Sequence, residues 1–155
     1  MMRKFWKTIA ATALLSSLVV ACGGSEQHES KEPARKVLTA LKKGQADKLE
    51  GYVKPARLSY YQVNADEIAK YQKSDLDEWQ RSFAEWNGRI DGPRFLNYDG
   101  VRIAIYSYAR LDGEHQTISI ERIDGEWVAV DWGSFGQDEW AELPETEAEA
   151  REEAG

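Results

Sequence analysis

The sequence contains one cysteine, Cys22, and two histidines, His28 and His115. A single cysteine excludes a disulfide within the chain and a metal site built from several thiolates. His28 lies in a polar segment near the N-terminus and His115 in a predicted hairpin, so neither belongs to a cluster spaced for metal binding or catalysis. We therefore expect no metal and no other cofactor.

The first 21 residues contain no acidic side chain. Arg3, Lys4 and Lys7 precede an apolar run from Ile9 to Ala21, which is 13 residues long. A helix needs about 20 residues to span the hydrocarbon core of a bilayer. A cationic start followed by a short apolar run is typical of a secretory signal peptide. We therefore predict that residues 1–21 are a signal peptide.

The apolar run ends in Val19-Val20-Ala21-Cys22, which resembles the lipobox of bacterial lipoproteins. The resemblance implies cleavage before Cys22, a diacylglyceryl group on its thiol and often a further acyl chain, such as palmitate, on the new amino terminus. One acyl chain binds a membrane reversibly, whereas two or three hold the protein stably. An ordinary cleaved signal peptide with an incidental cysteine is the alternative.

Lipoproteins retained at the inner membrane of Gram-negative bacteria often carry aspartate directly after the cysteine. Gly23 occupies that position here. The resemblance therefore implies a lipid-anchored protein of the cell envelope, on the outer membrane and facing the periplasm if the host is Gram-negative.

The chain lacks an excess of positive charge. It has 20 basic and 27 acidic side chains, and three of the basic ones lie in the predicted signal peptide. The mature chain then carries 17 basic and 27 acidic side chains, a formal charge of −10. Such a charge repels nucleic acid, and we expect no nucleic-acid partner.

The mature chain is long enough for one domain with one hydrophobic core. Residues 22–32 are the predicted lipidated N-terminus and flexible tether, because Gly23-Gly24-Ser25 follows Cys22 and the rest of the segment is polar and charged. Residues 33–141 form the predicted domain. Residues 142–155 are rich in glutamate and have no large apolar residue after Leu143, so we expect a disordered or weakly helical acidic tail.

Helices are predicted in the first half of the domain. One opens near Pro33, has an apolar stripe of Val37, Leu38 and Leu41, and closes at Gly44. A short second helix covers 46–53. Residues 56–73 are harder to interpret: 62–65 has the composition of a loop, with one or two helical turns after it. A further helix starts at Ser74, with an inward face made of Leu76, Trp79, Phe83 and Trp86.

Antiparallel strands are predicted in the second half. Asp112-Gly113 and Asp124-Gly125 are turn signals that separate strands at 101–111, 116–123 and 127–132, with a short edge strand at 95–98. On the first of these strands we expect Val101, Ile103 and Ile105 on one face, with Arg102, Tyr106 and Arg110 on the other. Ile118 and Ile120 share a face of the next strand, and Val128, Val130 and Trp132 share a face of the last. Helices followed by antiparallel strands predict an α+β fold, with N-terminal helices packed on a curved antiparallel sheet.

Two segments resemble bacterial lipoproteins of the cystatin-like superfamily, which includes ketosteroid isomerases, scytalone dehydratases and nuclear transport factor two. The first has Lys43, Gly44, Gln45, Leu49, Tyr52, Val53 and Pro55, and the second has Asp124, Gly125, Trp127, Val128 and Trp140. The resemblance covers about 45 residues and implies a cystatin-like α+β roll. It leaves function largely open, although this fold often forms homodimers through its sheet face.

The isomerase members of that superfamily use an acidic base and a tyrosine donor in a cavity. The corresponding candidates here are Asp131, Tyr106 and Tyr108. Strand alternation favours a solvent-facing Asp131. Neither paired carboxylates nor a Ser-His-Asp set supports catalysis, so we expect that the protein is not an enzyme and assign no catalytic residue.

Two groups of residues are candidates for binding. Tyr60, Tyr61, Tyr106 and Trp132, with Trp79 and Trp86, supply aromatic rings for a pocket, although Trp79, Phe83 and Trp86 are better explained as core. Arg102, Tyr106 and Arg110 form a stripe for an anionic ligand or an acidic partner on one face of the first long strand. A solvated sheet face is the alternative for this stripe.

The sequence favours an envelope lipoprotein that binds a protein or a small ligand. The partners expected are the membrane, through a lipid on Cys22, and an unknown protein or small molecule. A small-molecule isomerase or dehydratase and an immunity or inhibitor lipoprotein are the alternatives.

Overall fold

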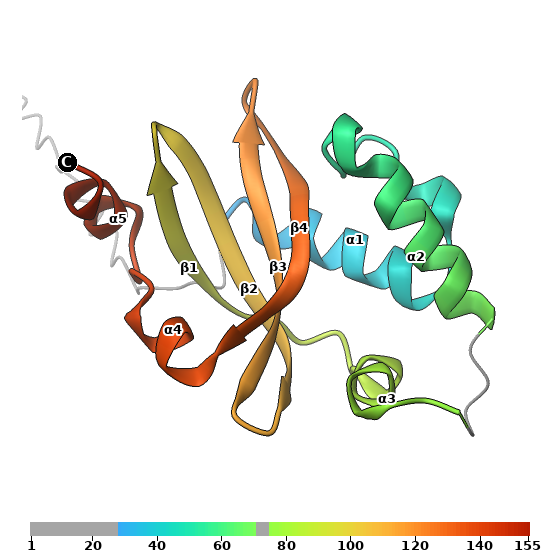
Figure 1. The fold of residues 1–155 in the computed structure, drawn as a ribbon. Coiled ribbons are helices and arrows are strands. Elements are labelled where there is room, and N and C mark those ends of the chain that lie inside the picture. Colours follow the sequence, from blue (N-terminus) through green and yellow to red (C-terminus); the bar gives the residue numbers. More distant parts are fainter. Residues whose placement is uncertain (1–27, 71–74) are drawn as a thin grey trace, which may run out of the picture.

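The computed structural model describes residues 28–70 and 75–155, which form an α+β structure (Figure 1). Its four strands make one antiparallel sheet in the order β1-β2-β3-β4. The strands are β1 (Asp91–Tyr98), β2 (Val101–Leu111), β3 (Glu114–Ile123) and β4 (Glu126–Gly136). The helices are α1 (Lys31–Lys42), α2 (Leu58–Lys70), α3 (Glu78–Glu85), α4 (Gln137–Glu142) and α5 (Glu147–Glu153).

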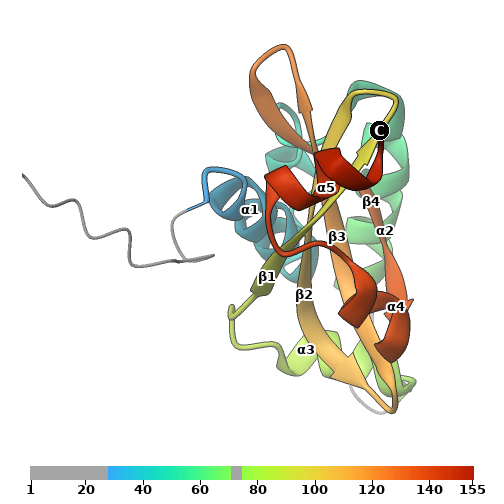
Figure 2. The same cartoon turned by 90° about the vertical axis from the view of Figure 1, so that its left-hand side faces the viewer.

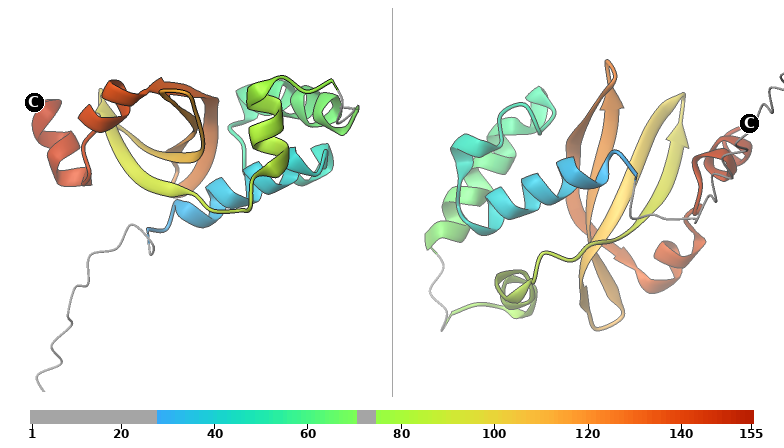
Figure 3. Two further views of the ribbon diagram at one scale, coloured as in Figure 1. Left: turned by 90° about the horizontal axis from the view of Figure 1, so that it is seen from below. Right: turned by 180° about the vertical axis from the view of Figure 1, so that it is seen from behind.

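The sheet is curved, and the helices gather on two sides of it. Seen from below, α1, α2 and α3 lie on one side, and α4 and α5 lie on the other (Figure 3). α1 contacts β3 and β4, and α3 contacts β2. The predicted fold class, helices packed on a curved antiparallel sheet, is confirmed.

Both predicted tight turns are present. Asp112-Gly113 joins β2 to β3, and Asp124-Gly125 joins β3 to β4. Asp124 and Gly125 have φ values of 49° and 87°, the left-handed pair that matches the twist of a two-residue hairpin. The outer strands are longer than predicted. β1 begins at Asp91, which pairs with Ser107, and β4 ends at Gly136, which pairs with Glu114.

Of the two predicted faces of β2, the one that carries Tyr106 faces the helices. Ala104, Tyr106 and Tyr108 lie in the core cluster with α1 and α3, whereas Ile105 is buried outside that cluster. Apolar and aromatic residues thus occupy both faces of β2. Periodicity cannot tell which face packs on the helices when both are covered.

β4 departs from the predicted pattern. The pairing of β3 with β4 shifts between Ser119 and Ile120, which leaves Val130 as an extra residue in β4. A bulge of this kind changes the alternation of side chains along a strand. Trp127 and Ala129 therefore lie in the core cluster with Trp132 packed against it, in place of the predicted set of Val128, Val130 and Trp132.

α1 forms as predicted, with Val37, Leu38 and Leu41 buried. It begins two residues before Pro33 and ends where Gly44 adopts a φ of +62°. A Cβ atom at Gly44 would lie 2.5 Å from the Cβ of Ala69 in α2. Glycine is therefore required both by the turn and by the approach of α2.

The second predicted helix, 46–53, is reduced to one short 3₁₀ turn, Ala46–Lys48. Gly51 interrupts it with a φ of +83°. The chain then runs beside β4: Ala129 donates its N–H to the carbonyl of Tyr52 and accepts the N–H of Lys54, each at 2.8 Å. Pairing with β4 replaces helix formation here, while Val53 stays buried.

The segment 62–65, predicted as a loop, is part of α2. This helix buries Tyr61 and Ala65, which are four residues apart, but its polar surface gives it a weak apolar pattern. α3 begins at Glu78 and not at Ser74, which lies outside the described residues. Asp77 caps α3, since its carboxylate accepts the N–H of Gln80 at 3.0 Å.

The acidic tail predicted for 142–155 is folded, and we call residues 143–155 the strap. The strap follows β1 (Figure 2), and the N–H of Phe95 donates to the carbonyl of Pro144 at 2.9 Å. Ala150 of α5 is buried. The tether is also shorter than predicted, because Ser30 is fully buried and α1 begins at Lys31. The folded unit therefore extends from the first described residues to the C-terminal helix.

No helix within 28–70 or 75–155 combines the length and the apolar character needed to cross a membrane. The predicted signal peptide, 1–21, and the predicted lipidation site, Cys22, lie outside the described residues.

Packing of the strap predicts a sharp difference between two alanines of α5. Ala150 is buried, whereas Ala148 is exposed. We expect Ala150→Lys to detach α5 from β1 and lower the free energy of unfolding by about 1–3 kcal/mol, because it places an ammonium group in an apolar contact. Ala148→Lys should change it by no more than about 0.5 kcal/mol. Urea denaturation with amide exchange of α5 measures both, and equal effects would contradict the packed strap.

Candidate functional site

The predicted stripe of Arg102, Tyr106 and Arg110 is not a continuous exposed surface. Tyr106 is fully buried, and its hydroxyl lies 2.8 Å from the hydroxyl of Ser30 at the start of α1. Arg102 is paired with Glu147 of the strap, and Arg110 alone is exposed. The prediction was wrong because Tyr106 faces the core, and because the shift in pairing between Ser107 and Ala109 places Arg110 beside His115 on the other face of the sheet.

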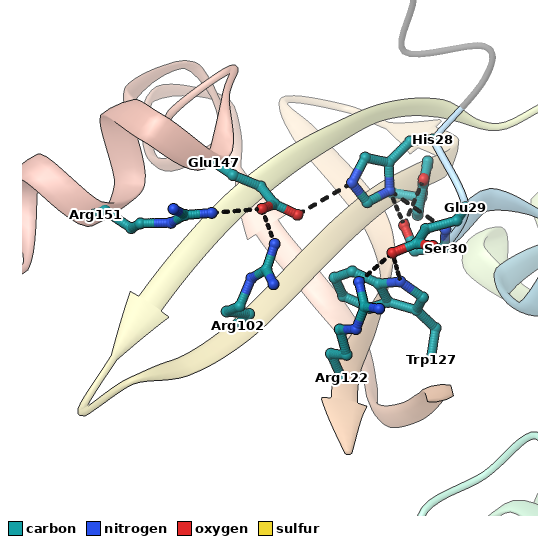
Figure 4. A network of polar contacts seen from close by, with 9 residues as sticks. His28, Glu29, Ser30, Arg102, Arg122, Trp127, Glu147 and Arg151 are labelled. Carbon is teal, nitrogen blue, oxygen red and sulfur yellow. Dashed lines mark hydrogen bonds and ion pairs between the residues drawn. The ribbon is translucent and has the colours of Figure 1, made fainter. Parts of the chain in front are cut away.

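Arg102 belongs to a polar cluster that joins the two ends of the folded unit (Figure 4). We call this cluster the clasp: His28, Glu29, Ser30, Arg102, Arg122, Trp127, Glu147 and Arg151. Glu147 accepts hydrogen bonds from Arg102 and from Arg151, the latter at 3.0 Å, and lies 3.3 Å from Nε2 of His28. Glu29 accepts from Arg122 and, at 2.8 Å, from the indole of Trp127.

The clasp favours the ionised form of its two carboxylates. Burial alone would raise the pKa of Glu147, but the hydrogen bonds from Arg102 and His28 outweigh that effect and hold the pKa below its ordinary value. The hydrogen bond from Trp127, followed by the charge of Arg122, lowers the pKa of Glu29. Glu147 joins His28 to Arg102, so the clasp holds the strap to the N-terminal residues, while Nε of Arg102 is buried without a hydrogen-bond partner among the described residues.

The acid–base arrangement considered for an isomerase is not formed. The side chain of Asp131 is 62% exposed and pairs with Arg57 at 3.2 Å. Tyr106 and Tyr108 are buried, and burial raises the pKa of Tyr106 to about 12 and also raises that of Tyr108, so both phenols are protonated at neutral pH. No group of three His, Cys, Asp or Glu side chains within the described ranges is arranged to hold a metal.

Two of the predicted binding residues, Tyr60 and Trp132, meet at a surface depression that we call the aromatic hollow. It has a volume of about 260 Å³ and lies where α2, α3, β3 and β4 approach one another. Its lining consists of Tyr60, Asn64, Trp79, Gln116, Trp132, Gly133 and Ser134. Aromatic walls with amide and hydroxyl groups between them suit a ligand that has both apolar and polar parts.

Neighbouring aromatic side chains fix the orientation of Trp132 in the wall of the hollow. Trp132 packs edge to face on Trp79, with ring centroids 5.9 Å apart, and its indole N–H donates to the hydroxyl of Tyr108. Phe83 lies 5.4 Å from both Tyr108 and Trp132, ring centre to ring centre. The orientation of Trp132 is therefore set before any partner arrives, which lowers the entropic cost of binding.

The adjacent tyrosines of α2 have different environments. Tyr60 is 43% exposed, with the guanidinium of Arg57 4.9 Å from its ring centre. Tyr61 is buried, its hydroxyl has no hydrogen-bond partner among the described residues, and burial raises its pKa. Tyr60 is therefore accessible to a partner, whereas Tyr61 belongs to the core.

Of the helix α3 aromatics, Phe83 and Trp86 are buried, as predicted. Trp79 is only half-buried and lines the hollow, so for this residue the preferred core assignment was wrong and the alternative, a ring that lines a pocket, is what the structure has. Helical spacing places Trp79 and Phe83 on the same face of α3. It does not tell which part of that face is covered by the sheet and which part borders the hollow.

A second depression, of about 700 Å³, is polar and open. It lies between α1 and the segment before β1, and its charged lining residues are Lys31, Arg35, Arg89 and Asp91. Arg89 pairs with Asp91 at 3.3 Å, which offsets part of its charge. The aromatic hollow is the stronger candidate for a binding site than this polar depression, because its aromatic side chains are half-exposed and held in place by their neighbours.

The clasp predicts that acid loosens the strap. A carboxylate whose pKa is lowered by folding stabilises the folded state above its unfolded pKa, and this contribution is lost as the pH falls through the folded pKa. We therefore expect the protection factors of the α5 amides, which correct for the slower intrinsic exchange in acid, to fall as the pH is lowered from 7 through 4. Glu147→Gln should remove part of that pH dependence. Glu153→Gln, which removes a charge outside the clasp, serves as the control, and identical pH profiles for the two variants would contradict this role.

No family model, curated protein or solved structure matches this chain. The resemblance to lipoproteins of the cystatin-like superfamily therefore stays a prediction. Among the described residues, the aromatic hollow is the feature that best indicates a function.

Proposed function

We propose that this protein is a lipid-anchored binding module of the bacterial cell envelope, and that the aromatic hollow receives its partner. The half-exposed, rigidly held rings of Trp79 and Trp132 opposite Tyr60 are the observation that carries the binding role. The pattern of residues 1–22 supports the anchor.

The anchor limits where the partner lies. If cleavage precedes Cys22, then six residues, 22–27, separate the lipid from the first described residue. An extended chain spans at most about 3.6 Å per residue, so the folded unit stays within about 20 Å of the bilayer. The expected partner is therefore part of the membrane surface or something that approaches it.

The hollow favours binding over catalysis. Its lining combines three aromatic rings with the neutral polar side chains of Asn64, Gln116 and Ser134. None of these is an acid, a base or an activated nucleophile of the kind that catalysis uses. Asp131, the acid proposed for an isomerase, points to solvent, and this weakens the enzyme alternative.

The anchor predicts a clear result for Cys22→Ser. Serine cannot form the thioether to the diacylglyceryl group, so we expect the variant to incorporate no labelled palmitate and to appear in the soluble fraction of the envelope. Ser25→Ala leaves the cysteine intact and should behave as the parent protein. A Cys22→Ser variant that remained membrane-bound and labelled would contradict lipidation at Cys22.

The hollow predicts position-specific crosslinking in intact cells. Tyr60 replaced by the photoreactive residue p-benzoylphenylalanine places the reactive group in the hollow, where we expect a discrete crosslinked product. The same residue at Val63, which is 57% exposed on α2 but does not line the hollow, is the matched control. Ser134→Trp, which fills the hollow from β4, should abolish the product at position 60. Equal products at both positions, or none, would overturn this site.

A further inference from the structure

The second half of β4 is an open edge of the sheet, and we call Asp131–Gly136 the open edge. β4 is the last strand of the sheet and pairs on one side with β3. On its outer side, the first half of β4 is covered: Ala129 pairs with 52–54, and Nε of Arg57 donates to the carbonyl of Val130 at 3.0 Å. The opposite edge of the sheet, β1, is covered by the strap.

Beyond Val130, the cover ends. Among the described residues, the backbone of 131–135 forms hydrogen bonds only with β3. Unpaired N–H and C=O groups along an edge strand are a template for another strand, and proteins usually protect such edges. An uncovered stretch of β4 directly after a covered one indicates a surface kept available for a partner.

Gly133 lies at the centre of this edge, and the fold itself does not explain it. Its φ is not in the left-handed region. A Cβ atom there would meet, within 4 Å, only the carboxylate of Asp131, at an ordinary contact distance of 3.7 Å. Glycine weakens a strand and often marks a place where another backbone comes close. A glycine at position 133 is therefore what we expect if a second chain runs along the open edge.

The aromatic hollow adjoins the same edge. Trp132, Gly133 and Ser134 belong to both the hollow and the open edge. In strand addition, main-chain hydrogen bonds give affinity, and pockets for alternate side chains give specificity. A hollow of about 260 Å³ accommodates one large apolar side chain of an added strand.

The charge around the edge indicates the character of the added strand. Asp131 lies on the edge, Glu114 pairs with Gly136, and Glu139 accepts the N–H of Gly136. Asp77 and Glu78 precede Trp79 at the start of α3. Arg57, a cation on this rim, is already paired with Asp131. The pair of Asp131 and Arg57 adds no net charge, so the negative charge near the edge comes from the other four carboxylates, which attract a basic chain and repel the same edge of a second copy.

We propose that the open edge binds an extended, basic segment of a partner protein as an added β-strand, with one large apolar side chain of that segment in the aromatic hollow. This inference rests on the proposed function and specifies its partner. Affinity then comes from backbone hydrogen bonds to 131–135, and selectivity comes from the aromatic hollow and the surrounding carboxylates.

The test uses the mature chain with Cys22→Ser and a display library of random seven-residue peptides. Selected peptides should be rich in Lys and Arg, should carry one aromatic or long aliphatic residue at a fixed position, and should protect the amides of 131–135 from hydrogen exchange. N-methylation of alternate peptide amides keeps the side chains but removes two or three hydrogen bonds, and should weaken binding roughly hundredfold. Tyr60→Ala should weaken it roughly tenfold, and Val63→Ala should not change it.

The failures are distinguishable. If selected peptides compete with crosslinking at Tyr60 but tolerate N-methylation and leave 131–135 unprotected, strand addition is wrong while the proposed function stands. If no peptide is selected although crosslinking at Tyr60 persists, the partner is not an extended peptide, and this proposal falls alone. Protection of 131–135 that rises with protein concentration in the absence of peptide would identify a second copy as the added strand and would also overturn it.

Discussion

An open sheet of four strands leaves two edge strands whose outer N–H and C=O groups need partners, and much of this structure serves that need. The strap covers β1 through Pro144 and α5, and the segment 52–54 covers the first half of β4. Each cover is held by side chains as well as by the backbone, since Arg94 donates to the carbonyl of Leu143 and Arg57 to that of Val130. What stays uncovered, the open edge, lies beside the aromatic hollow.

An irregularity in strand pairing places Trp132. The pairing of β3 with β4 shifts between Ser119 and Ile120. A shift of one residue moves the following side chains to the other face of the sheet. As a result Trp132 lies on the face that carries Trp127 and Ala129, where it meets Trp79 of α3 and Tyr108 of β2. A strand without this shift would point Trp132 away from α3, and the hollow would lose its wall.

Ion pairs with arginines of the sheet explain why the strongly acidic C-terminal segment is folded. Glu147 lies among Arg102, Arg151 and His28, and Arg94 pairs with Glu145 at 2.9 Å. Basic side chains of the sheet thus meet acidic side chains of the strap. Ion pairs at a partly exposed surface contribute little individually, but here they accompany the apolar contact of Ala150. The clasp also fixes the N-terminal residues from which the tether leads to the proposed lipid anchor.

The sequence by itself determined the α+β class, the buried stripe of α1, its end at Gly44 and the two Asp-Gly hairpins, because each depends on the conformational preferences of neighbouring residues. It also identified Tyr60 and Trp132 as candidates for binding, since aromatic side chains combine a large contact area with a polar group. Only the tertiary structure decided which face of β2 packs on the helices, that 58–70 is a helix, that 143–155 is folded, and that Tyr60, Trp79 and Trp132 meet. Those features arise from pairing register and from contacts between segments far apart in the chain, which local periodicity does not record.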